Sequence, residues 1–213
     1  MLLIKQFTFN PFAESTYVLS DAAGTHAIVV DPGMSDSGER DVVDRYIADE
    51  GLTLTAIVNT HLHLDHSFGI NYLKHRYCIP LMAHAADASL GLAIDEQLRR
   101  FGLPHVTDNV TIDTPLSDGD SVDIGGEKLQ VIHVPGHTPG GIALYSPDGK
   151  FLISGDSLFK GSIGRTDLPG GDYATLVRSV RDKLLPLPCA TLVLPGHEGS
   201  TTIGDERRYN PFV

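Results

Sequence analysis

Four potential metal ligands are crowded into one short segment of the chain. His61, His63, Asp65 and His66 fall within six residues, in a stretch that begins at Asn59, directly after the apolar run Ala56–Val58. Crowding imidazole and carboxylate donors at a strand end is costly unless divalent metal uses them as ligands. In an extended chain His61 and His63 point to the same side, so both rings can reach one ion. Asp65 and His66 lie just beyond, where the chain turns, and can bind a second ion.

Three further donors stand at the ends of other apolar runs. His137 follows Val-Pro-Gly, Asp156 follows Ile-Ser-Gly and His197 follows Leu-Pro-Gly. Glycine before each donor lets the backbone turn sharply there. Ligands in α/β folds bind beyond the carboxyl ends of strands. These similar strand ends therefore predict that the three donors lie beside the histidine-rich segment in one site.

The number of donors predicts two ions, because seven side chains are too many for one tetrahedral ion. The expected ligand sets are His61, His63 and His137 for one ion and Asp65, His66 and His197 for the other, with Asp156 bridging the two. We count Asp65 and Asp156 as the catalytic carboxylates. A water molecule between the ions would deprotonate near neutral pH, since even one zinc ion lowers the pKa of water to about 7. Zinc is the expected metal, although iron and manganese accept the same donors.

The elements that position these donors follow from hydrophobic periodicity. Alternation and apolar runs predict strands at 2–9, 16–19, 27–30, 54–60, 80–83, 121–124, 128–134 and 190–194, and a hairpin over 142–153 closed by Asp-Gly. Helical spacing predicts helices at 38–50, 68–77, 85–100 and 172–184, the last capped by Asp172. The first three strands form a meander. No repeat, composition break or linker divides residues 1–213, so we expect a single domain.

Composition and charge exclude several classes of partner. The chain has 213 residues and a formal net charge of −11, which argues against nucleic acid because phosphate binding needs a basic face. A small anionic substrate remains possible because bound metal ions add positive charge. No apolar stretch approaches the ~20 residues of a membrane helix, and no leader pattern opens the chain, so we expect a cytoplasmic protein. Cys78 and Cys189 have no partner motif and are expected to be reduced, half-buried thiols.

The donor pattern resembles that of the metallo-β-lactamase superfamily. The resemblance lies in Thr-His-Leu-His-Leu-Asp-His over residues 60–66, together with His137, Asp156 and His197, and it covers essentially the whole chain. It implies an α/β fold, a four-layer αβ/βα sandwich in which two mixed β-sheets are flanked by helices. Residues 155–159, 161–171 and 202–212 are similar to those of the single-domain, glyoxalase II-like (hydroxyacylglutathione hydrolase-like) hydrolases.

This resemblance implies a metal-dependent hydrolase that cleaves a thioester such as S-lactoylglutathione by attack of a metal-bound hydroxide. Arg165 stands where glyoxalase II has a lysine that contacts glutathione, so Arg165 is expected either to bind a substrate carboxylate or to brace its loop. Classical β-lactamases generally lack the histidine after the aspartate, and many place cysteine where Asp156 stands, which argues against lactamase activity. Glyoxalase II proper also carries a C-terminal helical domain that helps hold glutathione, whereas this chain ends soon after His197, which leaves the thiol carrier open.

Other functions remain open from the sequence. The persulfide dioxygenases of the same superfamily use one iron ion, which His61, His137 and Asp156 would hold here. A related lactone or ester hydrolase would use the same centre. A binding or regulatory module would show a broken ligand set, and this set is complete. Asn59, Thr60 and Thr138 could orient ligands, although polar residues at strand ends are more often turn formers. The sequence gives no indication of oligomeric state.

Overall fold

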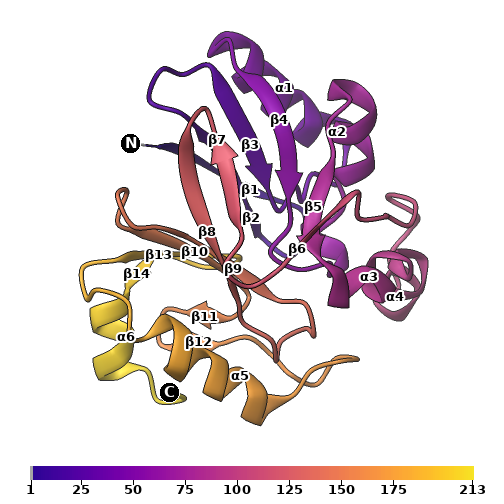
Figure 1. Ribbon diagram of the computed structural model, residues 1–213. Coiled ribbons are helices and arrows are strands. Elements are labelled where there is room, and N and C mark those ends of the chain that lie inside the picture. The colour runs from indigo at the N-terminus through magenta and orange to yellow at the C-terminus, as the bar shows by residue number, and fades with distance from the viewer. Residues whose placement is uncertain (1) are drawn as a thin grey trace.

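The computed structural model describes residues 2–213 and contains two six-stranded sheets (Figure 1). The strands of the first sheet lie in chain order, antiparallel at its start and parallel from the third strand on. They are β1 (Leu3–Phe9), β2 (Glu14–Ser20), β3 (His26–Val30), β4 (Thr53–Val58), β5 (Leu81–His84) and β6 (Thr114–Leu116). The predicted opening meander is therefore confirmed.

The second sheet is also mixed, with the order β14-β13-β10-β9-β8-β7 and one parallel pair, β10 with β13. Its strands are β7 (Ser121–Ile124), β8 (Glu127–His133), β9 (Ile142–Ser146), β10 (Phe151–Gly155), β13 (Leu192–Pro195) and β14 (Thr201–Thr202). The predicted hairpin is confirmed as the antiparallel pair β9 and β10. A small separate ribbon consists of β11 (Leu158–Phe159) and β12 (Ser162–Ile163).

Alternating side chains sort the core into three apolar layers. In β3, Ile28 and Val30 pack with residues of the second sheet, whereas Ala27 and Val29 pack with residues of the helices. The second sheet divides in the same way, because Ile153 of β10 joins the central layer and Leu152 joins the layer beneath the C-terminal helices. The central strands β2, β9 and β10 are therefore buried on both faces, as near-continuous apolar runs require.

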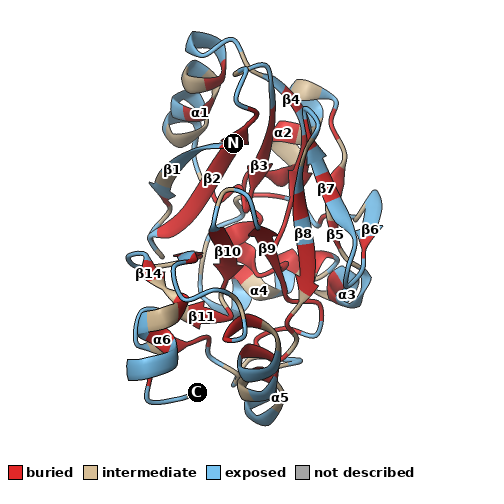
Figure 2. Ribbon diagram, turned by 60° about the vertical axis from the view of Figure 1, so that its left-hand side comes forward, coloured by how far each residue is buried: buried red, intermediate tan, exposed pale blue. Residues whose placement is uncertain are grey.

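Helices cover the outer face of each sheet. Over the first sheet lie α1 (Ser37–Asp49), α2 (Ile70–Tyr77) and α4 (Ile94–Arg100), and over the second lie α5 (Tyr173–Ser179) and α6 (Ile203–Tyr209). Figure 2 shows buried strands in the interior and exposed outer helix faces. The four-layer sandwich with two mixed sheets is thus confirmed. Within residues 2–213, no helix combines the length and apolar character needed to cross a membrane.

The predicted single helix over 85–100 is wrong. The segment divides into a 3-10 turn (Ala85–Asp87), α3 (Ala88–Gly91) and α4. The carbonyl oxygen of Gly91 accepts a hydrogen bond from the backbone N–H of Val110 at 2.9 Å, and a Cβ at Gly91 would crowd Val110. The Gly91 carbonyl oxygen thus bonds to a distant segment instead of to the next turn of a helix. Tertiary packing therefore overrides the helical spacing of the apolar residues.

Other local predictions have mixed outcomes. Asp172 does cap α5, accepting a hydrogen bond from the backbone N–H of Thr175, and a π-helical turn (Val180–Leu184) completes the predicted segment. The strands β6, β11, β12 and β14 have two or three residues each, too few for a periodic pattern to reveal. Both thiols, Cys78 and Cys189, are exposed, which corrects the expectation that they are half-buried.

Candidate metal centre

Three histidines from different parts of the chain form the first group of donors. His61 and His63 follow β4, and His137 follows β8. The His63 Nδ1 atom lies 2.9 Å from the His137 Nε2 atom, which lies 3.3 Å from the His61 Nε2 atom. All three side chains are buried. The predicted first ligand set is therefore gathered around one point.

The second predicted set gathers beside the first. Asp65 and His66 lie on a 3-10 turn (Leu64–His66), and His197 follows β13. The Nε2 atom of His197 lies 3.3 Å from both Asp65 Oδ2 and His66 Nε2. The turn thus presents the aspartate and the histidine to a strand end that lies more than a hundred residues further along the chain.

Asp156 stands between the two groups. Its Oδ1 atom is 3.5 Å from His66 Nε2, and its Oδ2 atom is 3.6 Å from both His137 Nε2 and His197 Nε2. The buried Oδ1 atom has no hydrogen-bond partner in the described part of the chain. A buried carboxylate oxygen without a partner is unfavourable, so this position calls for a cation.

The outer nitrogens of two histidines fix how their rings face the centre. His137 Nδ1 donates to the carbonyl oxygen of Arg165 at 2.7 Å, and His197 Nδ1 donates to that of Phe12 at 3.0 Å. Because Nδ1 is the donor in each case, the Nε2 atom of each ring is the one that faces the centre. Metal-binding histidines in proteins are usually held in this way.

The charge state of the donors also suits a metal centre. Burial and the neighbouring imidazoles lower the pKa of His61 well below its ordinary value and that of His63 to about 3, so both rings are neutral. Burial also opposes protonation of His66, but the carboxylates of Asp156, Asp65 and Asp31 outweigh it and raise its pKa. The carboxylates therefore demand positive charge, and metal ions supply it when they replace protons.

The distances fit the size of a metal coordination sphere. Two nitrogen ligands on a tetrahedral ion, each about 2.0–2.1 Å from it, are about 3.3–3.4 Å apart. The separations of 3.3 Å between His61 and His137 and between His66 and His197 match this edge. The two groups of histidine and aspartate could therefore hold metal ions.

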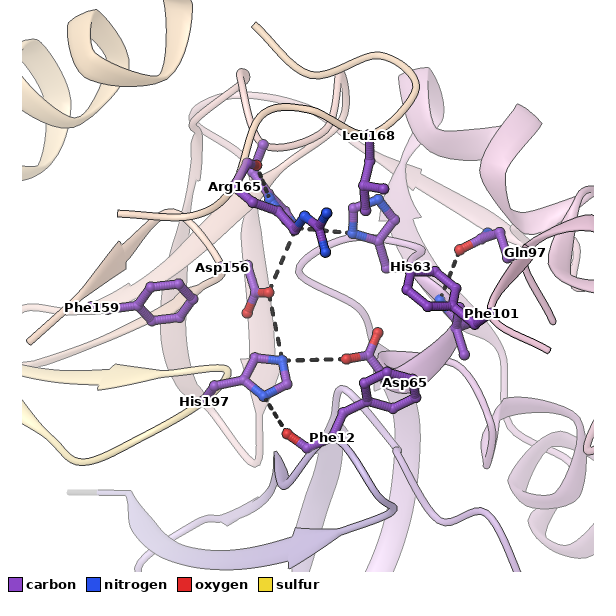
Figure 3. Close-up of a pocket in the computed structure, with 12 residues that line it drawn as sticks. Phe12, His63, Asp65, Gln97, Phe101, Asp156, Phe159, Arg165, Leu168 and His197 are labelled. Atoms are coloured by element: carbon purple, nitrogen blue, oxygen red, sulfur yellow. Dashed lines mark hydrogen bonds and ion pairs between the residues drawn. The ribbon is translucent and has the colours of Figure 1, made fainter. Parts of the chain in front are cut away.

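A cavity of about 280 Å³ opens above the donors. Figure 3 shows Asp65, Asp156 and His197 pointing toward one another beneath it. Apart from the donors, Gln97 and Arg165, its lining is apolar and consists of Phe12, Leu64, Phe101, Phe159 and Leu168. Such a mostly apolar pocket around a few polar groups is typical of a small-molecule site.

Comparison with known protein families identifies the superfamily that shares this arrangement. Residues 9–197 match the model of the metallo-β-lactamase superfamily. The chain belongs to this superfamily. Hydroxyacylglutathione hydrolase GloC of Haemophilus influenzae is 38% identical over 189 residues, covering 88% of this chain and 87% of the relative.

Solved structures of the superfamily resemble the whole chain. The B3 metallo-β-lactamase BLEG-1 has a TM-score of 0.89 at 36% identity, and the match covers 99% of both chains. TTHA1623, solved in a di-iron-bound form, has a TM-score of 0.86 at 37% identity, covering 98% of this chain and 100% of that one. A metal centre on this fold therefore accepts iron in at least one similar chain.

Arg165 lines the cavity, but its charge is already paired. The Nε and Nη2 atoms of Arg165 each donate to a different carboxylate oxygen of Asp167 at 2.7 Å. Its carbonyl oxygen, as described above, accepts from His137. Arg165 therefore stabilises the loop that orients His137. Its bidentate pairing with Asp167 leaves only part of the guanidinium available to a substrate.

Asp31 is a positioning residue that the sequence reasoning missed. Its carboxylate accepts hydrogen bonds from the backbone N–H and the hydroxyl of Thr60, both at 2.6 Å, and Oδ2 lies 3.2 Å from His66 Nδ1. Asp31 also has a φ of 50°, an uncommon conformation outside glycine. One signal was present in the sequence, since Asp31 lies at the end of a buried strand, as the predicted donors do, although it precedes its Pro-Gly turn and the donors follow theirs.

Asn59 and Thr60 support the histidine-rich segment from behind. Asn59 Nδ2 donates to the carbonyl oxygens of His61 and His66, at 3.2 and 2.8 Å. The Thr60 hydroxyl lies 3.1 Å from His61 Nδ1. Both side chains therefore orient residues of the centre in addition to forming the turn.

Two glycines allow the donors to approach so closely. Gly155 has a φ of 50°, which turns the chain directly before Asp156. A Cβ atom at Gly196 would overlap the carboxylate of Asp156, so the residue before His197 has no room for a side chain. The predicted sharp turn is confirmed at Gly155, whereas close packing against Asp156 is the reason for glycine at Gly196.

Asp87 is a second carboxylate that the sequence reasoning missed. It is fully buried and joins two loops of the site. Its oxygens accept from Gly140 N at 2.6 Å, Thr138 Oγ1 at 2.8 Å and Leu62 N at 3.2 Å. Asp87 thereby holds the loops on which His61, His63 and His137 stand.

We predict that Asp87→Asn lowers the free energy of unfolding by about 2–3 kcal/mol, because the amide turns a donor toward groups that are themselves donors. Urea denaturation of the metal-loaded protein measures this change. The control is Asp41→Asn on α1, where the side chain is exposed. Equal stabilities of the two variants would contradict a positioning role for Asp87.

Proposed function

We propose that this chain is a binuclear metal-dependent hydrolase of thioesters such as S-lactoylglutathione. Membership of the superfamily and the similarity to a chain named hydroxyacylglutathione hydrolase support this proposal. The observation that carries it is chemical. Apart from the donors and the partly paired Arg165, no acidic or basic side chain lines the cavity within residues 2–213.

The proposed ligands are the seven side chains described above, with Asp156 bridging the two groups. Two divalent ions bound there would acidify a water molecule and polarise the scissile carbonyl. Asp65 and Asp156 hold negative charge at the centre, and His137 and His197 are fixed by backbone carbonyls. The phenylalanine and leucine walls of the cavity exclude bulk water from the reacting carbonyl.

The leaving group selects thioesters among acyl substrates. A thiolate departs without prior protonation because the pKa of its conjugate acid is about 8.5. An amide nitrogen needs a proton as it leaves. With the acids and bases of the cavity committed as ligands, thioester cleavage requires nothing that the site lacks.

The remaining parts of the proposal concern metal, partner and compartment. Zinc is the proposed metal, and the di-iron form of TTHA1623 makes iron the first alternative. The proposed partner is a small anionic thioester, with glutathione as the proposed thiol carrier, and no nucleic acid is expected to bind. A cytoplasmic location accords with two exposed free thiols, Cys78 and Cys189, which persist in reducing compartments.

The rival function is oxidation of a persulfide at a single iron held by His61, His137 and Asp156. The similarity to ETHE1 from Myxococcus xanthus, with a TM-score of 0.79 at 29% identity, supports it. The test combines elemental analysis of protein purified without added metal with three assays. We expect S-lactoylglutathione to be cleaved under nitrogen with two metal ions per chain. Oxygen uptake with glutathione persulfide, without thioester cleavage, would establish the rival. Preferential cleavage of a β-lactam, the reaction named for BLEG-1, would also refute the proposal.

A further inference from the structure

A second cavity of about 200 Å³ adjoins the one above the metal centre. The two cavities share four lining residues, which are His63, Gln97, Phe101 and Leu168. Figure 3 labels these four residues along one side of the first cavity. A substrate whose carbonyl lies above the donors can therefore extend one arm past Phe101 into the second cavity.

Two opposite charges line the second cavity from one face of α4. Glu96 and Arg100 are four residues apart, so their Cβ atoms lie about 5–6 Å from each other on the same side of the helix. Both residues are exposed, and neither side chain forms a hydrogen bond or ion pair within residues 2–213. The buried residues Ile94 and Leu98 occupy the opposite face of α4 and anchor it in the core.

Arg100 differs in this respect from Arg165. Arg165 donates to both carboxylate oxygens of Asp167, whereas the guanidinium of Arg100 has all its donors available. A free guanidinium is a strong ligand for a carboxylate. Of the two arginines beside the centre, Arg100 is therefore the one equipped to bind an anionic group of a substrate.

We propose that the second cavity is a specificity subsite for an arm that ends in a free α-amino acid, with Arg100 binding its carboxylate and Glu96 its ammonium. Such an arm carries both charges on one carbon atom, which matches two opposite charges one helical turn apart. The γ-glutamyl end of glutathione has this chemistry. The apolar walls, which include Leu90, Ala93 and Pro169, would pack on the methylene groups. This inference rests on the proposed thioesterase function.

Gln97 connects the subsite to the metal centre. Its Oε1 atom accepts from the backbone N–H of Leu64 at 3.0 Å, and its Nε2 atom donates to the carbonyl oxygens of Leu62 and Leu90 at 3.3 and 3.0 Å. The helix that bears Glu96 and Arg100 is thereby tied to the segment that bears His63 and Asp65. The subsite thus has a fixed position relative to the scissile bond.

The test compares two thioesters that share the lactoyl group, S-lactoylglutathione and the lactoyl thioester of 2-mercaptoethanol, which has no charged arm. Arg100→Met should raise KM for the glutathione thioester about tenfold, because a charge-assisted hydrogen bond is lost, and leave kcat unchanged. The neutral thioester should be unaffected. Arg99→Met is the matched control, since Arg99 lies on α4 and outside both cavities. Equal KM values in the two variants would overturn the subsite.

A binding measurement separates this inference from the proposed function. Calorimetric titration with S-methylglutathione, which cannot be hydrolysed, should give a Kd about tenfold weaker for Arg100→Met and for Glu96→Gln than for the wild type or Arg99→Met. If the wild type cleaves neither thioester, the proposed function fails, and the titration still decides on the subsite. Undiminished affinity in both pocket variants overturns it.

Discussion

Replacing Asp156 by alanine is expected to abolish thioester cleavage and to lower the amount of bound metal. The Asp156 carboxylate lies within 3.5–3.6 Å of donor nitrogens from both groups, so its loss would remove a ligand from both of the proposed ions. Residues that only orient ligands typically contribute about 10–100-fold to activity or metal affinity. We therefore expect kcat/KM to fall by more than about 100-fold. The measurements are steady-state kinetics and elemental analysis on the same preparation.

Asp148→Ala is the control for this variant. It removes the same charge from an exposed position in the turn between β9 and β10. Thermal unfolding of both variants distinguishes loss of the centre from loss of the fold. An Asp156→Ala protein that retains full activity together with two metal ions per chain would refute the bridging role.

The donors could be predicted from the sequence because each one follows a strand. A strand end fixes where the next side chain stands, and His137, Asp156 and His197 share an edge of the second sheet because they follow β8, β10 and β13. The histidine-rich segment follows β4 of the first sheet, and the packing of the two sheets on each other brings it to the same edge. The same reasoning predicted the hairpin and the cap at Asp172, because short-range chemistry decides them.

The carboxylates behind the centre could not be predicted in this way. Asp87 accepts from Leu62 and from Thr138, which are 25 and 51 positions away, and nothing in the residues around Asp87 specifies those partners. Glu14 is likewise fully buried, 3.9 Å from His66 Nδ1. Burial raises the pKa of the Glu14 carboxyl group well above its ordinary value, despite the opposing effect of His66. Such roles depend on tertiary neighbours.

The broken helix over 85–100 shows the same limit for the fold. Its stripe of Leu90, Ile94 and Leu98 satisfies helical spacing, and Gly91 costs a helix only about 1 kcal/mol relative to alanine. The approach of Val110 decides against continuity, and this approach is a property of the assembled core. The break has a functional consequence, because it lets α4 lie along both cavities with Gln97 directed at the metal-binding segment.

Removal of metal by a chelator is expected to lower the melting temperature by an amount on the order of 10 °C. A ligand at about 1,000 times its Kd stabilises the native state by about 4 kcal/mol, and 1 kcal/mol corresponds to about 2–4 °C in a chain of this size. The cause is specific to this centre. Without the cations, the buried carboxylates face neutral imidazoles. Their negative charge must then be balanced by protons that rings such as His66 take up.

Scanning fluorimetry before chelation, after dialysis and after return of zinc or iron measures this effect. The melting temperature should recover with added metal and should depend on its concentration, because only the native state gathers the donors. Asp148→Ala should respond as the wild type does, whereas Asp156→Ala should show a smaller shift because it starts with less metal. If elemental analysis shows that the metal is gone while the melting temperature is unchanged, the clustered donors do not hold it. Recovery with one equivalent of metal instead of two would favour the single-iron chemistry of the rival function over the paired centre.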